Sequence, residues 1–379
     1  MLGRTPQPAA PQTYGRGLEN LVFGDTAICR IDGARGELSF RGYPVADLTQ
    51  HCSLEQVIWL IINGDLPDAG ELGAWHESLQ RWREPPVGAI NAIYHLPDGT
   101  SPFAAFRTAL AVAAAVAPDA SRRDADAQRE RPARIIAWSY ALAAAAIRCH
   151  QRKEPVAPRG DLPMAAHFLW QAFGAVPDEV AARAFEVSLI LQSEHDIHAA
   201  ALAAVAVVSA GGDLDGAVLA GVGALSGRLH GGANQTAFRL VQSFEGDVQR
   251  ARSWTRERIA EKHRFPGFGH RVYKTHDPRG RALAPHARRL LERQGQSALW
   301  EVFEAVREEI ESALGAKGIF ANVDAFTGLI YHPLGLPVPA FTIPFCLAVQ
   351  TGWMAHCLEY LGGPPLRPTA LWLGEPPGA

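Results

Sequence analysis

Residues 186–210 read EVSLILQSEHDIHAAALAAVAVVSA, and this stretch decides the fold class. Small apolar side chains would surround much of the circumference of a helix formed here, which is typical of a helix buried in a core or at a subunit interface. Residues 133–149, ARIIAWSYALAAAAIRC, have the same character. The sequence therefore predicts a mainly α-helical protein.

Toward the N-terminus, local signals predict one hairpin and one well-bounded helix. Residues 25–43 alternate apolar and polar side chains around an Asp-Gly turn, and they form the only convincing β signal. A helix is expected to begin at Ser53 as the N-cap, with Glu55 and Gln56 in the first turn, and to end at Gly64. Residues 118–132 are charged and bounded by proline, so we expect a solvated loop or a domain seam.

Toward the C-terminus, composition suggests a second domain. Residues 231–330 are more charged than the rest, and within them residues 252–262 and 288–294 have the pattern of amphipathic surface helices. We expect a small helical domain over residues 231–330. Residues 1–230 and 331–379 would form the large helical domain.

Charge and composition limit the kinds of partner. The 379 residues carry 36 basic and 39 acidic side chains, a formal charge of -3, which leaves no strong field for nucleic acid or membrane. Small molecules and further copies of the chain are the expected partners. Five cysteines without metal-ligand spacing indicate a reduced compartment. The N-terminus lacks a signal-peptide pattern and the longest apolar run, 199–208, is short of the ~20 residues of a membrane span, so we predict a cytoplasmic protein.

Four segments concentrate histidine, aspartate, arginine and glycine. They are SEHDIHAA (193–200), GRLHGGAN (227–234), RFPGFGHRVYKTHDPR (264–279) and NVDAFTG (322–328). Each alone has a structural explanation: His195 as a core histidine, Gly267 and Gly269 as a tight turn, His230 as a helix-end cap and Asp324 as an N-cap.

Together the segments resemble a known family. With GLENLVFGDTAICRIDGARGELSFRGYPVADL (17–48) and LRPTALWLGE (366–375), they occur in the order and spacing of citrate synthases of the short bacterial type. The resemblance covers residues 17–375. It implies a two-domain helical fold with a small N-terminal β-hairpin, a homodimer, and an acyltransferase of the tricarboxylic acid cycle. Such an enzyme condenses acetyl-CoA with oxaloacetate and then hydrolyses the thioester.

The resemblance assigns three catalytic residues. Asp324 matches the base that removes a proton from the acyl α-carbon, a step that requires a carboxylate held against that carbon. His230 matches the donor that stabilises the enolate oxygen, and His270 matches the histidine that polarises and protonates the keto carbonyl.

The resemblance also assigns the binding residues. His195 and Arg279 match positions that hold the keto acid, and Arg367 matches an arginine contributed by the other subunit. For coenzyme A the resemblance assigns Arg264, Gly267, Gly269, Arg271 and Lys274. Coenzyme A enters only as the thioester substrate, and no cofactor or metal is expected.

Several positions depart from the family pattern. Val349 stands where the family has an arginine that clamps a keto-acid carboxylate. Removing one partner of a buried ion pair typically costs ~3–5 kcal/mol, here of binding free energy. Unless Gln350 or another donor compensates, oxaloacetate should bind poorly. His198 and Ala200 replace asparagine and serine, and Ala200 leaves His230 without its orienting partner.

Two smaller departures complete the set. Arg228 replaces a proline, and residues 101–103, Ser-Pro-Phe, replace His-Pro-Met. Three hypotheses remain: an ordinary citrate synthase, a synthase of altered substrate such as a 2-methylcitrate synthase with His198 or Arg228 as the replacement cation, or a weakly active paralogue that serves as a binding or regulatory module. Retention of an acid, a base and an electrophilic donor favours catalysis. Closure of a cleft between the domains is expected.

Overall fold

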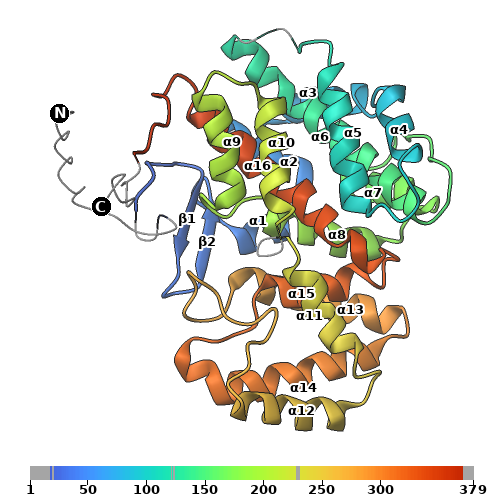
Figure 1. Ribbon diagram of the computed structural model, residues 1–379, viewed down its shortest axis with the longest axis vertical. Coiled ribbons are helices and arrows are strands. Elements are labelled where there is room, and N and C mark those ends of the chain that lie inside the picture. The colour runs from blue at the N-terminus through green and yellow to red at the C-terminus, as the bar shows by residue number, and fades with distance from the viewer. Residues whose placement is uncertain (1–17, 19–20, 121, 123, 228–230, 370–379) are drawn as a thin grey trace, which may run out of the picture.

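The computed structural model describes residues 18, 21–120, 122, 124–227 and 231–369. These residues form sixteen α-helices and one small sheet, which confirms the mainly helical class (Figure 1). The helices are α1 (Val45–His51), α2 (Leu54–Asn63), α3 (Ala69–Arg81), α4 (Val87–Tyr94), α5 (Pro102–Ala115), α6 (Ala125–His150), α7 (Met164–Phe173), α8 (Glu179–Gln192), α9 (Ala199–Ser209), α10 (Leu214–Leu225), α11 (Ala233–Gln242), α12 (Val248–Ala260), α13 (Pro278–Arg293), α14 (Ser297–Leu314), α15 (Val323–Tyr331) and α16 (Thr342–Glu359).

The predicted hairpin is present and packs against a loop that lies far along the chain. Strands β1 (Cys29–Asp32), β2 (Glu37–Phe40) and β3 (Tyr43–Pro44) form an antiparallel sheet in that order. The backbone oxygen of Gly33 in the turn accepts a hydrogen bond from Lys274 N (2.9 Å). A Cβ atom at Gly33 would lie 2.3 Å from the Val272 oxygen, so only glycine allows this close approach.

The predicted bounds of α2 are confirmed. Ser53 Oγ accepts a hydrogen bond from Gln56 N, and Gln56 Oε1 accepts one from Ser53 N, which is a complete capping box. The helix ends at Gly64, whose φ of 107° favours glycine.

The prediction of a solvated loop over residues 118–132 was wrong in its second half. Helix α6 begins after the N-cap Asp124 and continues through Pro132. Arg131 and Arg134 are buried, and their charges are compensated by a cluster of carboxylates. The carboxylates belong to Asp119, Asp213 and Asp215. Two of these aspartates lie more than 80 positions away in the sequence, so a local pattern could not reveal the pairing.

Residues 186–210 form two helices instead of a continuous one. Helix α8 ends at Gln192 and α9 begins at Ala199, and the intervening turn contains Asp196 at a φ of 61°. His198 is the N-cap of α9, with its Nδ1 accepting a hydrogen bond from Ala200 N (3.3 Å). His195 is therefore held in a turn at a helix break, not on the apolar face of a helix.

Helix α16 is a core helix that supports the cavity described below. Within the part of the chain that the structure describes, Val338–Glu359 is the one helical stretch long and apolar enough to cross a membrane, and 83% of its apolar window is buried inside the protein. Figure 1 shows α16 among the upper helices, while α11 to α15 gather in the lower part of the molecule. Helix α13 packs against α8, so the two parts are in contact.

Candidate active site

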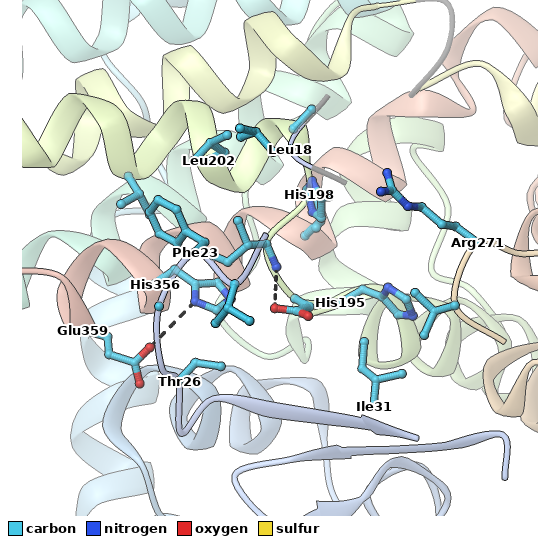
Figure 2. A pocket seen from close by; sticks show the side chains of 18 of the residues that line it. Leu18, Phe23, Thr26, Ile31, His195, His198, Leu202, Arg271, His356 and Glu359 are labelled. Atoms are coloured by element: carbon cyan, nitrogen blue, oxygen red, sulfur yellow. Dashed lines mark hydrogen bonds and ion pairs between the residues drawn. The ribbon is translucent and has the colours of Figure 1, made fainter. Parts of the chain in front are cut away.

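A cavity of about 1190 Å³ collects side chains from five separate segments. The arm before β1, the α8–α9 turn, the loop before α13, the start of α15 and the middle of α16 all contribute to its wall. Predicted site residues in the wall are His195, His270, Arg271, Arg279 and Asp324, together with the departures His198 and Val349. Figure 2 shows His195, His198 and Arg271 with His356 and Glu359 around the same space.

His195 is placed beside the second histidine of the site. Its Nε2 lies 3.2 Å from Tyr273 Oη, and its ring centroid is 5.2 Å from that of His270. Burial, together with the charge of Arg279, holds the pKa of His195 well below its ordinary value. His195 is therefore a neutral hydrogen-bonding group at neutral pH.

His270 has a defined tautomer. Its Nδ1 accepts hydrogen bonds from the backbone N–H groups of Val272 (3.1 Å) and Tyr273 (3.2 Å). Nδ1 is thus unprotonated and the ring proton is on Nε2, so the 3.5 Å approach of Arg279 Nη2 to Nε2 is a contact between two donors and not a hydrogen bond. Burial and the nearby charge of Arg279 lower the pKa of His270 to about 4. The residue is a neutral donor whose Nε2–H can stabilise a developing oxyanion.

Arg279 stays charged although it is buried. Burial alone would lower its pKa, but Asp277 raises it through Nε–Oδ1 and Nη2–Oδ2 bonds of 3.0 Å and 2.8 Å. The same carboxylate accepts a hydrogen bond from Val323 N (3.1 Å). Asp277 therefore connects the arginine to the first turn of α15, which carries Asp324.

Asp324 is not the N-cap of its helix, so that simpler explanation is wrong. Asn322 is the N-cap, and its Oδ1 accepts the hydrogen bond from Asp324 N (3.0 Å). The Asp324 carboxylate is left to face the cavity. Burial raises its pKa to about 6, although the charge of Arg279 partly opposes that shift. A carboxylate with this pKa can remove a proton near neutral pH.

The glycine turn explains why His270 and Asp324 meet in one cavity. Gly267 and Gly269 have φ values of 81° and 80°, which confirms the tight turn. Gly267 O accepts a hydrogen bond from Asn322 N (2.9 Å), and Asn322 Nδ2 donates to Gly269 O (2.8 Å). The turn therefore joins the chain just before His270 to the N-cap of α15.

Other predicted binding residues lie outside the cavity wall. Arg264 and Arg367 are exposed. The Lys274 ammonium donates to Arg271 O (2.9 Å), so it is turned back onto its own loop. His230 and Arg228 lie outside the described residues. Within the described part of the chain, no group of three or more histidine, cysteine, aspartate or glutamate side chains is arranged to hold a metal ion.

The departures differ in their structural consequences. Val349 is 1% exposed and lies in the cavity wall with Phe345, so this part of the wall is apolar. Gln350 does not replace the missing cation, because its amide bonds to Ser139 Oγ (3.0 Å) and Leu347 O (3.2 Å) inside the core. His198 Nδ1 lies 3.3 Å from the donor Ala200 N, and its Nε2 lies 3.5 Å from the donor Trp353 Nε1, so a protonated ring, which has no acceptor nitrogen, would lose both contacts.

The remaining departures are structural. Ser101 is the N-cap of α5, and its Oγ accepts a hydrogen bond from Ala104 N (3.2 Å). Pro102 occupies the first helical position and Phe103 is buried. Ala200 is fully buried in the first turn of α9. These side chains pack within the large helical assembly and do not line the cavity.

Sequence reasoning missed several members of the site. Tyr273 lies in the predicted loop, but nothing in its spacing indicated its contact with His195. Residues 21–27 line one side of the cavity, held by the bond from Ala27 N to Glu359 Oε1 (2.9 Å) and by stacking of Phe23 on Tyr360. Only the long-range pairing of the arm with the end of α16 reveals this wall.

Taken together, the cavity has the properties of an enzyme site that removes a proton with a carboxylate and stabilises an oxyanion with a neutral imidazole. Comparisons with known proteins agree. Residues 17–369 match the family model described as "Citrate synthase, C-terminal domain". The chain is 33% identical to citrate synthase of Deinococcus radiodurans over 95% of each chain. It is 36% identical to 2-methylcitrate synthase of Mycobacterium tuberculosis, covering 95% of this chain and 90% of that one.

Solved structures show the same fold. Citrate synthase from Pyrobaculum aerophilum superposes with a TM-score of 0.90 at 29% identity, covering 99% of this chain and 97% of that one. The ternary complex of Thermoplasma acidophilum citrate synthase with carboxymethyl coenzyme A and oxaloacetate gives a TM-score of 0.90 at 30% identity, over 96% and 97% of the two chains. The chain belongs to the citrate synthase family. It is an acyltransferase that carries out a citrate synthase-like condensation.

Proposed function

We propose that the protein condenses acetyl-CoA with oxaloacetate and hydrolyses the thioester product. The observation that carries the proposal is the cavity shared by the Asp324 carboxylate, whose pKa is raised to about 6, and the Nε2–H group of His270. A base and a neutral donor on opposite sides of a carbon–carbon bond in formation are what this condensation requires.

The proposed steps use residues of this chain. Asp324 removes a proton from the α-carbon of the acyl thioester, and the resulting enol or enolate attacks the keto carbon. The new carbon–carbon bond converts the keto oxygen into an alkoxide, which takes the Nε2 proton of His270. Arg279 and His195 hold the keto acid. Water then attacks the thioester and releases the coenzyme A thiol and a carboxylate. His230 is assigned to the enolate oxygen by resemblance only.

Coenzyme A binding is proposed for the exposed cations beside the cavity. Arg264 and Arg271 are exposed and have the charge needed for phosphate groups, and the Lys274 ammonium donates a hydrogen bond to its own loop. The turn formed by Gly267 and Gly269 would line the adenine side. The thioester is a substrate, and the proposed reaction uses no further cofactor or metal.

The proposed assembly is a homodimer of two-domain subunits, in the cytoplasm. The large domain would comprise residues 1–230 and 331–379, and the small domain residues 231–330, with closure excluding water from the site. Exposed positions on the packed pair α9 and α10 are small residues, which would allow close helix packing between subunits. Examples are Ala199, Ala206 and Gly223. The exposed Arg367 would reach the partner's site.

One observation favours a second candidate. Val349, Phe345 and Val205 give the cavity an apolar wall, and none of them can pair with a second carboxylate. The apolar area supports a synthase of the 2-methylcitrate type, because it could pack against the extra methyl group of propionyl-CoA, and the lack of a cation supports a keto acid with one carboxylate.

Release of the coenzyme A thiol tests both candidates. Purified protein is assayed with acetyl-CoA and propionyl-CoA against oxaloacetate and a panel of 2-keto acids with one carboxylate. Saturable turnover with acetyl-CoA and oxaloacetate supports the first proposal. A higher kcat/KM for propionyl-CoA or for another keto acid supports the second. An absence of turnover with every pair contradicts both and favours a weakly active paralogue with a binding role.

A further inference from the structure

A buried ion pair lies at the wall of the cavity and has no part in the steps above. Glu194 and His356 are 1% and 3% exposed, and Glu194 Oε1 lies 3.0 Å from His356 Nε2. Glu194 precedes His195 in the chain, whereas His356 comes from α16 and lines the cavity. The pair therefore joins the core helix to the turn that carries a proposed substrate-binding histidine.

Glu194 also stabilises an unfavourable backbone conformation in this turn. Its Oε1 accepts a hydrogen bond from Asp196 N (2.5 Å). Asp196 has a φ of 61°, which is uncommon for a residue with a side chain and requires support from its surroundings. A second bond, from Gly352 N to Ser193 O (3.0 Å), attaches the start of the turn to α16. The start and the middle of the turn are thus both connected to α16.

Helix α16 makes room for Glu194 through a single glycine. A Cβ atom at Gly352 would lie 1.8 Å from Glu194 Oε2 and 2.9 Å from its Cδ. Any side chain at Gly352 would therefore force the Glu194 carboxylate to move. Glycine in the middle of a helix is destabilising, and here that cost is offset by the space that the missing side chain leaves for the Glu194 carboxylate.

The buried Glu194 carboxylate is paired with the His356 imidazole. Burial by itself would lower the pKa of His356, but the hydrogen bond and charge of Glu194 raise it above the ordinary value, with Glu359 adding to the effect. A buried carboxylate that lost this partner would be left uncompensated. His356 thus gives the buried Glu194 carboxylate a partner, while Oε1 of the same carboxylate accepts the hydrogen bond from Asp196 N.

We propose that Glu194 and His356 are positioning residues that hold the turn 193–198 so that His195 faces Tyr273 and the keto acid. The assignment of the keto acid to His195 rests on the proposed function. The pair does not touch the reacting atoms. Its loss displaces the imidazole of His195, and displacement by about 1 Å can cost ~100-fold in rate.

The first test compares two buried histidines. His356→Gln is expected to raise the KM for the keto acid about tenfold while leaving the KM for the acyl-CoA within about twofold. His167→Gln is the matched control, since His167 is 4% exposed and accepts a hydrogen bond from Arg159 N (3.2 Å) in α7, away from the cavity. Equal changes in both KM values, or the same change in the control, would overturn the proposal.

The second test moves Glu194 without removing a polar group. Gly352→Ala should reproduce the rise in keto-acid KM, because the new Cβ displaces the carboxylate. Gly73→Ala in α3 is the control, since nothing lies within 4 Å of a Cβ built there. Thermal melting of all four variants is measured in parallel. A variant Gly352→Ala with unchanged keto-acid KM would contradict the proposal.

A third readout separates this inference from the proposed function. With 13C-labelled histidine, the His195 Cε1–H resonance is assigned by its loss in His195→Gln. It should shift in His356→Gln and Gly352→Ala and stay in place in His167→Gln and Gly73→Ala. This holds whether or not the wild-type protein turns over any substrate pair. An unmoved His195 resonance overturns the positioning role, whereas absent wild-type turnover overturns only the proposed function.

Discussion

Asp277 and Arg279 form a buried ion pair through two bonds, with Nη2 and Oδ2 2.8 Å apart, while the same Oδ2 accepts the N–H of Val323. The pair lies between the arginine assigned to the keto acid and the helix that carries Asp324. One carboxylate therefore aligns two functional groups that lie 45 positions apart in the sequence.

Replacement of this carboxylate should harm both stability and catalysis. Asp277→Asn leaves the guanidinium of Arg279 buried without a countercharge, and such losses cost ~3–5 kcal/mol of folding free energy. Urea unfolding of the variant measures the change. Asp161→Asn, which removes an exposed partner of Arg159, is the control and should leave the unfolding midpoint almost unchanged. Equal midpoints for the two variants would contradict the buried-pair argument.

Ionised Asp324 should lower the free energy of unfolding while it supports catalysis. Its pKa is raised from 3.8 to about 6 in the folded protein, so the ionised carboxylate is disfavoured there, and folding stability increases as pH falls from above 6 toward 4. Asp324→Asn removes this cost and should stabilise the protein at pH 8 by up to about 3 kcal/mol. Denaturation at pH 8 and pH 4 measures the difference, which should vanish at the lower pH.

The same carboxylate predicts the acid limb of the rate profile. Proton removal requires ionised Asp324, so kcat/KM should fall tenfold per pH unit below about 6. Asp324→Asn should abolish turnover. Variant activity equal to that of the wild type would eliminate the proton-abstraction role.

His270 should act as a neutral donor throughout the working pH range. Its pKa is lowered to about 4, so it contributes no titration to kcat between pH 5 and 8. His270→Gln is expected to lose on the order of 100- to 1000-fold in kcat, the range for removal of one oxyanion donor. His276→Gln, in the same loop but outside the cavity wall, is the control and should retain nearly full kcat.

Val349 should determine the preference between keto acids. Val349→Arg places a guanidinium in the apolar wall. The KM for oxaloacetate should fall about 10- to 100-fold, because the second carboxylate of oxaloacetate gains a charged partner. The KM for a keto acid with one carboxylate should rise, because that substrate offers no second carboxylate to pair with the buried guanidinium. Val349→Met adds volume without charge. If both variants change the two KM values alike, volume alone explains the effect.

The sequence by itself determined the features that depend on neighbouring residues. The alternation and Asp-Gly turn of residues 25–43 produced the hairpin, and the capping box of Ser53 and Gln56 produced the start of α2. The glycine turn before His270 was also predictable, since a positive φ is a local requirement. Linked motifs were sufficient for the family, because several of them in one order rarely coincide.

Features that depend on distant partners could be recognised only in the folded chain. The helix break at His195 is held by α16, the start of α6 lies within a charged stretch whose arginines pair with distant aspartates, and Gln350 is engaged by Ser139 in the core. Each reflects the cost of burying a polar or charged group without a partner. Which partner lies within reach is a property of the folded chain, because local periodicity contains no information on contacts more than a few residues apart.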